Sequence, residues 1–320
     1  MDIASPSPFN DAAHINTTTS YKNISYDFST SEELVFATVT MVLCVLGILG
    51  NGLVIWLLGS SFKRNTFPIY FLNLSVADFG FLTFELMIEI YWRFAYWSNN
   101  LHIDSNLLYE FFEMGRLIMY STGQFLLTAI SIDRCVSVHF PIWYRCHRPV
   151  HLSTILRAVI WAISIIHPSI NFIIVAGTGY EWTYEWSSLY PFMINTVLCL
   201  PLMTISSVIL LIKICFVSQR QRRRKLLTAV LLTLFFFLVS AFPLNTIHLI
   251  LYYQNGISPK FLHYGYSLAC INSSINPLIY YLLGRKKGET QRSIKDFIQR
   301  VFKEEENCTS QMETSEGSKI

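Results

Sequence analysis

The chain has 320 residues, of which 52% are hydrophobic, 15% are aromatic and only 14% are charged. Soluble domains carry about 25% charged residues, so this composition excludes an ordinary soluble protein and is typical of an integral membrane protein. The formal net charge is +3 at pH 7, a small total that hides an uneven distribution of Lys and Arg along the chain.

Residues 1–30 are rich in Ser, Thr and Asn and are expected to be disordered. They contain no apolar core of the kind found in cleavable signal peptides, so we expect the first membrane helix to direct insertion. Asn16 and Asn23 each begin an Asn-x-Ser/Thr triplet, the acceptor sequence for N-glycosylation. They predict glycosylation if this end of the chain lies outside the cell.

Seven apolar stretches follow, joined by short connections. Each is long enough to cross a membrane, which takes about 20 apolar residues. The expected spans are 34–60, 67–92, 107–138, 153–176, 187–216, 224–253 and 260–283. The predicted fold class is therefore all-α, a bundle of seven transmembrane helices over residues 34–284.

The distribution of Lys and Arg predicts the orientation of the bundle. If the N-terminus is outside, only four of the 24 basic residues fall on the outer side, namely Lys22, Arg93, Arg116 and Lys260. Because Lys and Arg are enriched in cytoplasmic segments, residues 1–33 are expected outside the cell and the C-terminus inside.

The segment after the last span has an amphipathic pattern. Ile294, Phe297, Ile298 and Val301 recur at helical spacing between basic residues, which predicts a short helix over 285–303 lying on the lipids of the inner leaflet. Residues 304–320 form an acidic, then Ser/Thr-rich, cytoplasmic tail that is expected to be disordered.

The sequence lacks the motifs of common enzyme, cofactor and metal sites. It has no Gly-rich phosphate loop, no His-Glu-x-x-His and no nucleophile elbow, so no catalytic residue, cofactor or metal is expected. None of the seven cysteines lies in a predicted outer loop, and no extracellular disulfide is expected. The basic run at 220–225 lies between two membrane spans, which favours the inside-positive rule over nucleic-acid binding.

Asp78 lies about 16 Å into the second predicted helix, where a carboxylate is expected to be functional. Asn272, Asn276 and Tyr280 are spaced four residues apart and share one face of the seventh helix. We therefore predict a core polar cluster of Asp78, Asn272 and Asn276, reached by Asn51 from the first helix. The alternative is a set of buried polar groups that only bind one another.

The residues from Leu117 to Ile132 carry no charge, and Asp133-Arg134-Cys135 follows them directly. Charges are costly at the centre of a bilayer and tolerated at its edge. The pair therefore marks the point where the third helix meets water, although a simple helix stop would give the same pattern.

These motifs, taken together, resemble the rhodopsin-like G-protein-coupled receptors over residues 34 to about 303. Within that class the chain resembles the Mas-related receptors, on the sequence from Gly50 to Gly59, on Arg64-Asn65 and on the loop from Phe140 to Pro149. The matching positions are Gly50-Asn51, Leu72 to Asp78, Asp133-Arg134-Cys135, Trp161, Pro201, Pro243 and Asn276-Pro277-Leu278-Ile279-Tyr280.

The resemblance implies a multi-pass receptor of the plasma membrane that activates a heterotrimeric G protein. It implies that the sixth helix swings outward on activation and exposes Arg134. The residues it assigns to activation and coupling are Asp133, Arg134, Cys135, Pro243, Asn276, Pro277 and Tyr280. The chain departs from the class at Gly123, where a serine usually helps to bind sodium, and at Tyr109, where a cysteine usually forms a disulfide.

Three acids lie in the outer turns of the predicted helices. We predict that Glu85, Glu89 and Glu113 form an acidic mouth for a cationic extracellular ligand, a basic peptide or a small molecule, with Trp182 and Trp186 stacking on its cations. Mas-related receptors often recognise such ligands. One alternative is that Arg93 and Arg116 merely neutralise these acids, and another is that Arg116 binds a ligand carboxylate.

A membrane transporter or channel is the rival class. It predicts internal repeats or several charged residues along a path through the helices. Asp78 is the one charged residue at mid-depth in the predicted spans, and the sequence shows no obvious repeat.

Overall fold

The computed structural model describes residues 31–61, 66–97, 106–140, 142, 144, 149, 151–178, 193–216, 221–253 and 260–284. The chain divides into two compact units, Met1–Thr38 and Val39–Ile320. In the first unit the described residues are the opening turns of α1 (Ser31–Ser61), where the Thr38 hydroxyl donates to the Leu34 carbonyl at 2.7 Å. The helix packing and the sites described below lie within the second unit.

The prediction of seven helices is confirmed over the described residues, where each apolar stretch contains one helix. Their bounds lie within a few residues of the expected spans where both ends are described. The predicted amphipathic helix at 285–303 lies outside the described residues. After α1 come α2 (Thr66–Trp97), α3 (Asn106–His139), α5 (Leu152–Thr178), the π-helical turn η1 (Asn195–Cys199) continued by α7 (Leu200–Phe216), α8 (Gln221–Tyr253) and α9 (Lys260–Gly284).

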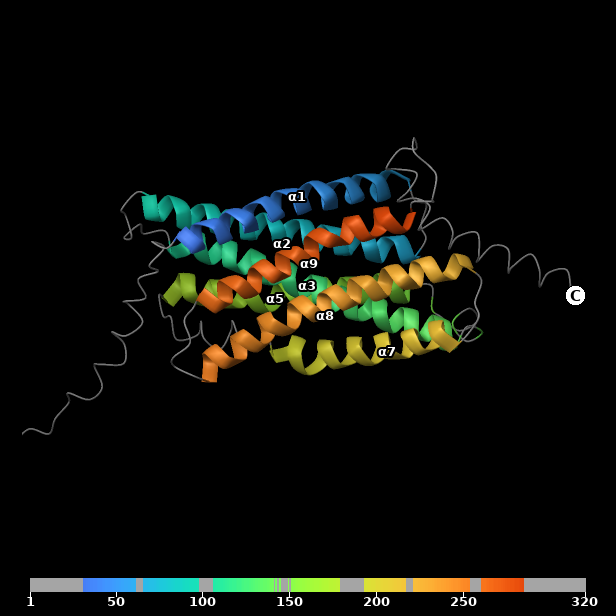
Figure 1. The fold of residues 1–320 in the computed structure, drawn as a ribbon. Coiled ribbons are helices and arrows are strands. Elements are labelled where there is room, and N and C mark those ends of the chain that lie inside the picture. Colours follow the sequence, from blue (N-terminus) through green and yellow to red (C-terminus); the bar gives the residue numbers. More distant parts are fainter. Residues whose placement is uncertain are drawn as a thin grey trace, which may run out of the picture. The chain divides into compact units, whose positions relative to one another are not determined.

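α3 is the central helix of the second unit. It packs most extensively against α2 and also contacts α5, α7 and α8, while α9 packs against α8 and α2. Figure 1 shows these helices running alongside one another. Side chains on α3 can therefore reach most of the other helices, which explains why α3 carries charged residues that a helix facing lipid would not tolerate.

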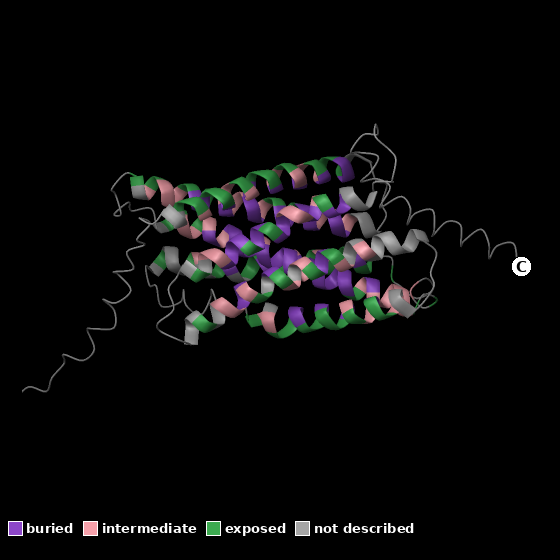
Figure 2. Ribbon diagram, viewed as in Figure 1, coloured by how far each residue is buried: buried purple, intermediate pink, exposed green. Residues whose placement is uncertain are grey.

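Many large apolar side chains are exposed on this bundle, and several polar and charged ones are buried in it. Large apolar residues such as Trp56, Val197 and Phe235 are exposed, whereas Asn51, Asp78 and Glu85 are buried. Figure 2 shows this pattern, with buried residues gathered between the helices and exposed ones on their outer sides. An apolar outer surface fits contact with lipid.

Four described helices are long and apolar enough to cross a membrane by length and composition alone. They run over Leu34–Gly59, Ile69–Ala95, Leu152–Ile170 and Thr196–Lys213. α3 is not among them, and it contains the charged residues Glu110, Glu113, Arg116, Asp133 and Arg134.

α1 and α9 approach closely because two glycines of α1 face α9. A Cβ atom on Gly47 would overlap the side chain of Ser274, and one on Gly50 would lie 3.2 Å from Cγ of Pro277. At this approach the Ser274 hydroxyl donates to the Leu43 carbonyl at 3.0 Å. The glycines allow α1 to contact α9 beside Pro277, which lies within the helix.

Candidate functional site

The first cluster of charged residues joins α2, α3 and α9. Arg116 on α3 donates from Nη1 to Glu85 Oε2 on α2 at 2.8 Å, and from Nη2 to Glu113 one turn away on its own helix. Its Cζ atom lies 3.5 Å from the centroid of the Tyr266 ring on α9. All three charged side chains are at least nine-tenths buried, so this is an ion-pair cluster shielded from solvent.

A second acid–base contact lies one helical turn along α2. Glu89 Oε1 is 3.1 Å from Nδ1 of His263 on α9, and the imidazole is 31% exposed while the carboxylate is 3% exposed. The two contacts together tie α2 to both α3 and α9 at the end of the bundle that contains Glu85.

The three predicted acids lie at the same end of the bundle. They contact basic side chains of the receptor itself and do not form an open acidic mouth. Glu85 and Glu113 share the guanidinium of Arg116, and Glu89 faces His263. Arg116 thus pairs with two of the three acids, in line with the alternative that it neutralises them. Trp182 and Trp186 lie outside the described residues.

An apolar layer separates this cluster from the centre of the bundle. It contains Leu117 and Tyr120 of α3, Phe81 and Leu82 of α2, and Tyr266 of α9, all of them buried. Tyr266 therefore contacts the Arg116 cluster and also belongs to this layer. Phe81 and Tyr120 pack together with their ring centroids 5.7 Å apart and form one wall of a cavity beneath the layer.

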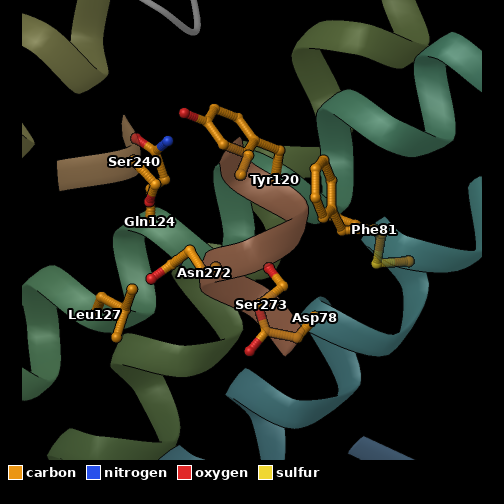
Figure 3. Close-up of a pocket in the computed structure, with 11 residues that line it drawn as sticks. Asp78, Phe81, Tyr120, Gln124, Leu127, Ser240, Asn272 and Ser273 are labelled. Atoms are coloured by element: carbon orange, nitrogen blue, oxygen red, sulfur yellow. The ribbon is translucent and has the colours of Figure 1, made fainter. Parts of the chain in front are cut away.

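Asp78 lies at this central cavity and is bonded to α9. The Asn276 side-chain amide donates to Asp78 Oδ2 at 2.7 Å. Figure 3 shows Ser273 directly beside the Asp78 carboxylate, and Asn272 on the adjacent wall. Asp78 is the only carboxylate among the residues that line the cavity.

The cavity is small. The space in which the centre of a water molecule could lie has a volume of about 20 Å³. One buried water needs about 10–15 Å³ of such space. Gly123 leaves part of this space open, since a Cβ atom there would lie 4.0 Å from Asp78 Oδ1. The described residues contain no group of three or more His, Cys, Asp or Glu side chains that could hold a metal ion.

Asn51 joins the central cluster through the backbone. Its Nδ2 atom donates to the Ser273 carbonyl on α9 and to the Gly47 carbonyl on α1, both at 3.0 Å. Asn51 therefore binds the backbone carbonyl of Ser273, and the Ser273 side chain lies beside Asp78 (Figure 3). The Asn272 side chain lines the cavity instead.

The far end of α3 holds the Asp133–Arg134 pair. Arg134 Nη2 donates to Asp133 Oδ2 at 2.9 Å, and the Tyr144 hydroxyl donates to both oxygens of the same carboxylate at 3.0 and 3.1 Å. Arg134 is buried. Cys135 is partly buried and its Sγ atom lies 4.0 Å from His139 Nδ1.

Two other residues assigned by resemblance are described. Tyr280 is fully buried, and its ring meets Phe71 of α2 edge-on at a centroid distance of 5.2 Å. Pro243 lies inside α8. Asn16 and Asn23 lie outside the described residues.

Three contact residues were missed by the sequence analysis: Tyr266, His263 and Tyr144. Tyr266 and His263 are three residues apart on α9, so helical spacing could have placed them on one face. Their partners on α2 and α3 depend on how the helices are rotated against one another, which spacing does not give.

Comparison with known proteins decides the family. Residues 50–280 match the model of the 7 transmembrane receptor (rhodopsin family). Mas-related G-protein coupled receptor member H of Rattus norvegicus is 35% identical over 279 residues, 84% of each chain. The chain belongs to the Mas-related receptors of the rhodopsin family. The human Proto-oncogene Mas is 32% identical over 278 residues, 83% of each chain.

Membership of this receptor family means that the chain is a multi-pass membrane receptor and not an enzyme. It also answers the rival prediction of a transporter or channel in favour of a receptor. α3 runs the length of this receptor, with Arg116 near one end and Arg134 near the other. Their separation of 18 residues corresponds to about 27 Å along the helix.

Proposed function

We propose that this receptor binds a cationic extracellular ligand at Glu85, Glu89 and Glu113 and activates a heterotrimeric G protein at the Arg134 end of α3. The proposal rests on one observation: α3 contains residues of both charged clusters. The Arg116 cluster ties α3 to α2 and α9, and the Asp133–Arg134 pair lies at the opposite end.

The ligand class is inferred from charge. Glu85, Glu89 and Glu113 bring three carboxylates to one end of the bundle, where Arg116 pairs with both Glu85 and Glu113, and Glu89 faces His263. A buried carboxylate without a full counter-charge is unfavourable, so a ligand cation placed there is favoured. The related proteins are named G-protein coupled receptors, which supports the proposed partner on the other side of the membrane.

The proposed orientation places the Glu85 end outside the cell and the Arg134 end in the cytoplasm. It is supported by the low number of Lys and Arg residues on the outer side. Asn16 and Asn23 would then face the compartment where glycosylation occurs, and the exposed apolar side chains would contact lipid in the plasma membrane.

The ligand half of this proposal is tested by removing the charges one at a time. Cells that express the receptor are screened with basic peptides and cationic small molecules, and second-messenger production is measured. Glu85→Gln, Glu89→Gln and Glu113→Gln are each expected to weaken a basic agonist, with the maximal response retained at high dose. Unchanged potency in all three variants, at equal surface expression, would rule out this site.

A further inference from the structure

The guanidinium of Arg116 occupies the position that a ligand cation would take. It bridges Glu85 and Glu113 through its two terminal nitrogens and lies over the Tyr266 ring, with Cζ 3.5 Å from the centroid. Two carboxylates and an aromatic face are the groups that recognise a guanidinium or ammonium ion. The receptor therefore carries its own cation inside its acidic site.

This internal cation leaves the site incompletely satisfied. Two carboxylates and one guanidinium carry one net negative charge, and all three side chains are at least nine-tenths buried. Arg116 Nε is buried without a hydrogen-bond partner among the described residues. The hydrogen bonds from Arg116 go to Oε2 of Glu85 and Oε2 of Glu113, and neither uses the Oε1 atom of its carboxylate. Acceptor capacity for a second cation thus remains beside the first.

We propose that Arg116 is an internal competitor of the ligand, and that a guanidinium or primary ammonium group of the ligand replaces it on Glu85 and Glu113. This inference rests on the proposed function, because it assumes that the ligand reaches these acids. A ligand carboxylate is disfavoured at Arg116, since it would meet the two carboxylates already bound there.

The replacement changes contacts on three helices. In the structure, Arg116 is the single side chain that contacts Glu85 of α2, Glu113 of α3 and the Tyr266 ring of α9 together, among the described residues. When the ligand cation takes the carboxylates, Arg116 releases the Tyr266 ring, and α9 loses this link to α3. Ligand binding and helix rearrangement are thereby the same event at this position.

Chemical rescue tests the site without any signalling readout. Arg116→Ala leaves a space for a guanidinium between the two carboxylates. The melting temperature of the purified full-length receptor is measured with methylguanidinium chloride and with an equal concentration of sodium chloride. We expect Arg116→Ala to melt below the wild type, and methylguanidinium to restore at least about half of the loss, while sodium chloride does not.

The matched control is Arg157→Ala on α5. Arg157 also lies over an aromatic ring, that of Tyr70 at 5.9 Å, but among the described residues it donates to the Ser153 carbonyl and the Thr154 hydroxyl of its own helix and not to a carboxylate. Methylguanidinium is expected to leave this variant unchanged. Equal rescue of both variants, or rescue of neither, would overturn the proposal.

A second pair of variants covers the case in which Arg116→Ala does not fold. Arg116→Met with Glu113→Gln keeps one net negative charge at the cluster but removes the internal cation. If Arg116 competes with the ligand, argininamide binds this double variant about tenfold or more tightly than the wild type, equivalent to about 1.4 kcal/mol. If only net charge matters, binding is unchanged, and that result contradicts the proposal.

Neither measurement depends on the G protein. The receptor could signal through Arg134 and respond to the loss of Glu85, and yet show neither rescue by methylguanidinium nor tighter binding of argininamide. That outcome would support the proposed function and contradict the role of Arg116 as an internal competitor.

Discussion

The Asn276 side-chain amide donates to Asp78 Oδ2 at 2.7 Å, and this hydrogen bond joins α9 to α2 at the centre of the bundle. Asn276 immediately precedes Pro277, which lies where α1 approaches α9 at Gly50. The bond therefore joins α9 to α2 near the point where α1 approaches α9, and it lies between the Arg116 cluster and the Arg134 end of α3.

We expect Asp78→Asn to change the balance between resting and active receptor more than it changes ligand contact. The substitution keeps the size of the side chain but removes the charge that Asn276 binds. A hydrogen bond to a charged group contributes about 1.5–3 kcal/mol, against about 0.5–1.5 kcal/mol for a neutral one. Basal and maximal nucleotide exchange in membranes, at matched receptor density, measure the shift. A change in ligand affinity alone, with basal and maximal exchange unaltered, would contradict the assignment.

Asn51→Ala is expected to lower the stability of the receptor by about 1–3 kcal/mol, because it leaves the Ser273 and Gly47 carbonyls without the amide that binds them. The melting temperature of the purified receptor reports the loss. Thr83→Ala is the control, since the Thr83 hydroxyl bonds only the Phe79 carbonyl of its own helix. If the two variants melt alike, the link from Asn51 to α9 contributes nothing measurable.

Tyr144→Phe is expected to raise basal nucleotide exchange. The Tyr144 hydroxyl donates to the carboxylate that pairs with Arg134, so its loss removes about 1.5–3 kcal/mol from the paired arrangement. Tyr70→Phe serves as a control, because it also removes a buried tyrosine hydroxyl, but from α2 and not from the Asp133–Arg134 pair. Equal basal exchange in the wild type and Tyr144→Phe would show that this hydroxyl does not stabilise the resting pair.

A membrane-permeant thiol oxidant is expected to join Cys44 of α1 to Cys270 of α9. Their Sγ atoms lie 3.7 Å apart and both residues are fully buried. Oxidation by diamide removes two protons and two electrons from the thiols and forms a disulfide, which mass spectrometry of unreduced peptides detects. Cys199, which is also buried, is expected to stay reduced. A disulfide that links Cys270 to Cys199 would contradict the described packing of α1 and α9.

The helices could be predicted from the sequence because each apolar stretch is long and short connections separate it from the next. The proximity of Glu113 to Arg116 follows from their spacing of three residues on one helix. The position of Asp78 relative to Asn276 was expected because each is a polar residue in an apolar helix and needs a partner.

Contacts that depend on helix rotation could not be predicted in the same way. Arg116 reaches Glu85 and Tyr266 only because α2, α3 and α9 turn the appropriate faces toward one another. Asn51 binds a backbone carbonyl, and every residue offers one, so the sequence contains no signal for that choice. Tyr144 follows α3 in a segment whose sequence indicated only basic charge.

The most direct test of the account is G-protein nucleotide exchange by Arg134→Ala. Membranes with equal surface amounts of wild-type receptor and variant are treated with a basic agonist found in the screen, and binding of a non-hydrolysable GTP analogue is measured. We expect Arg134→Ala to lose the agonist response while agonist binding at the Glu85 end persists, and the control Arg157→Ala to keep the response. Full exchange by Arg134→Ala would contradict the assignment of this end of α3 to the G protein.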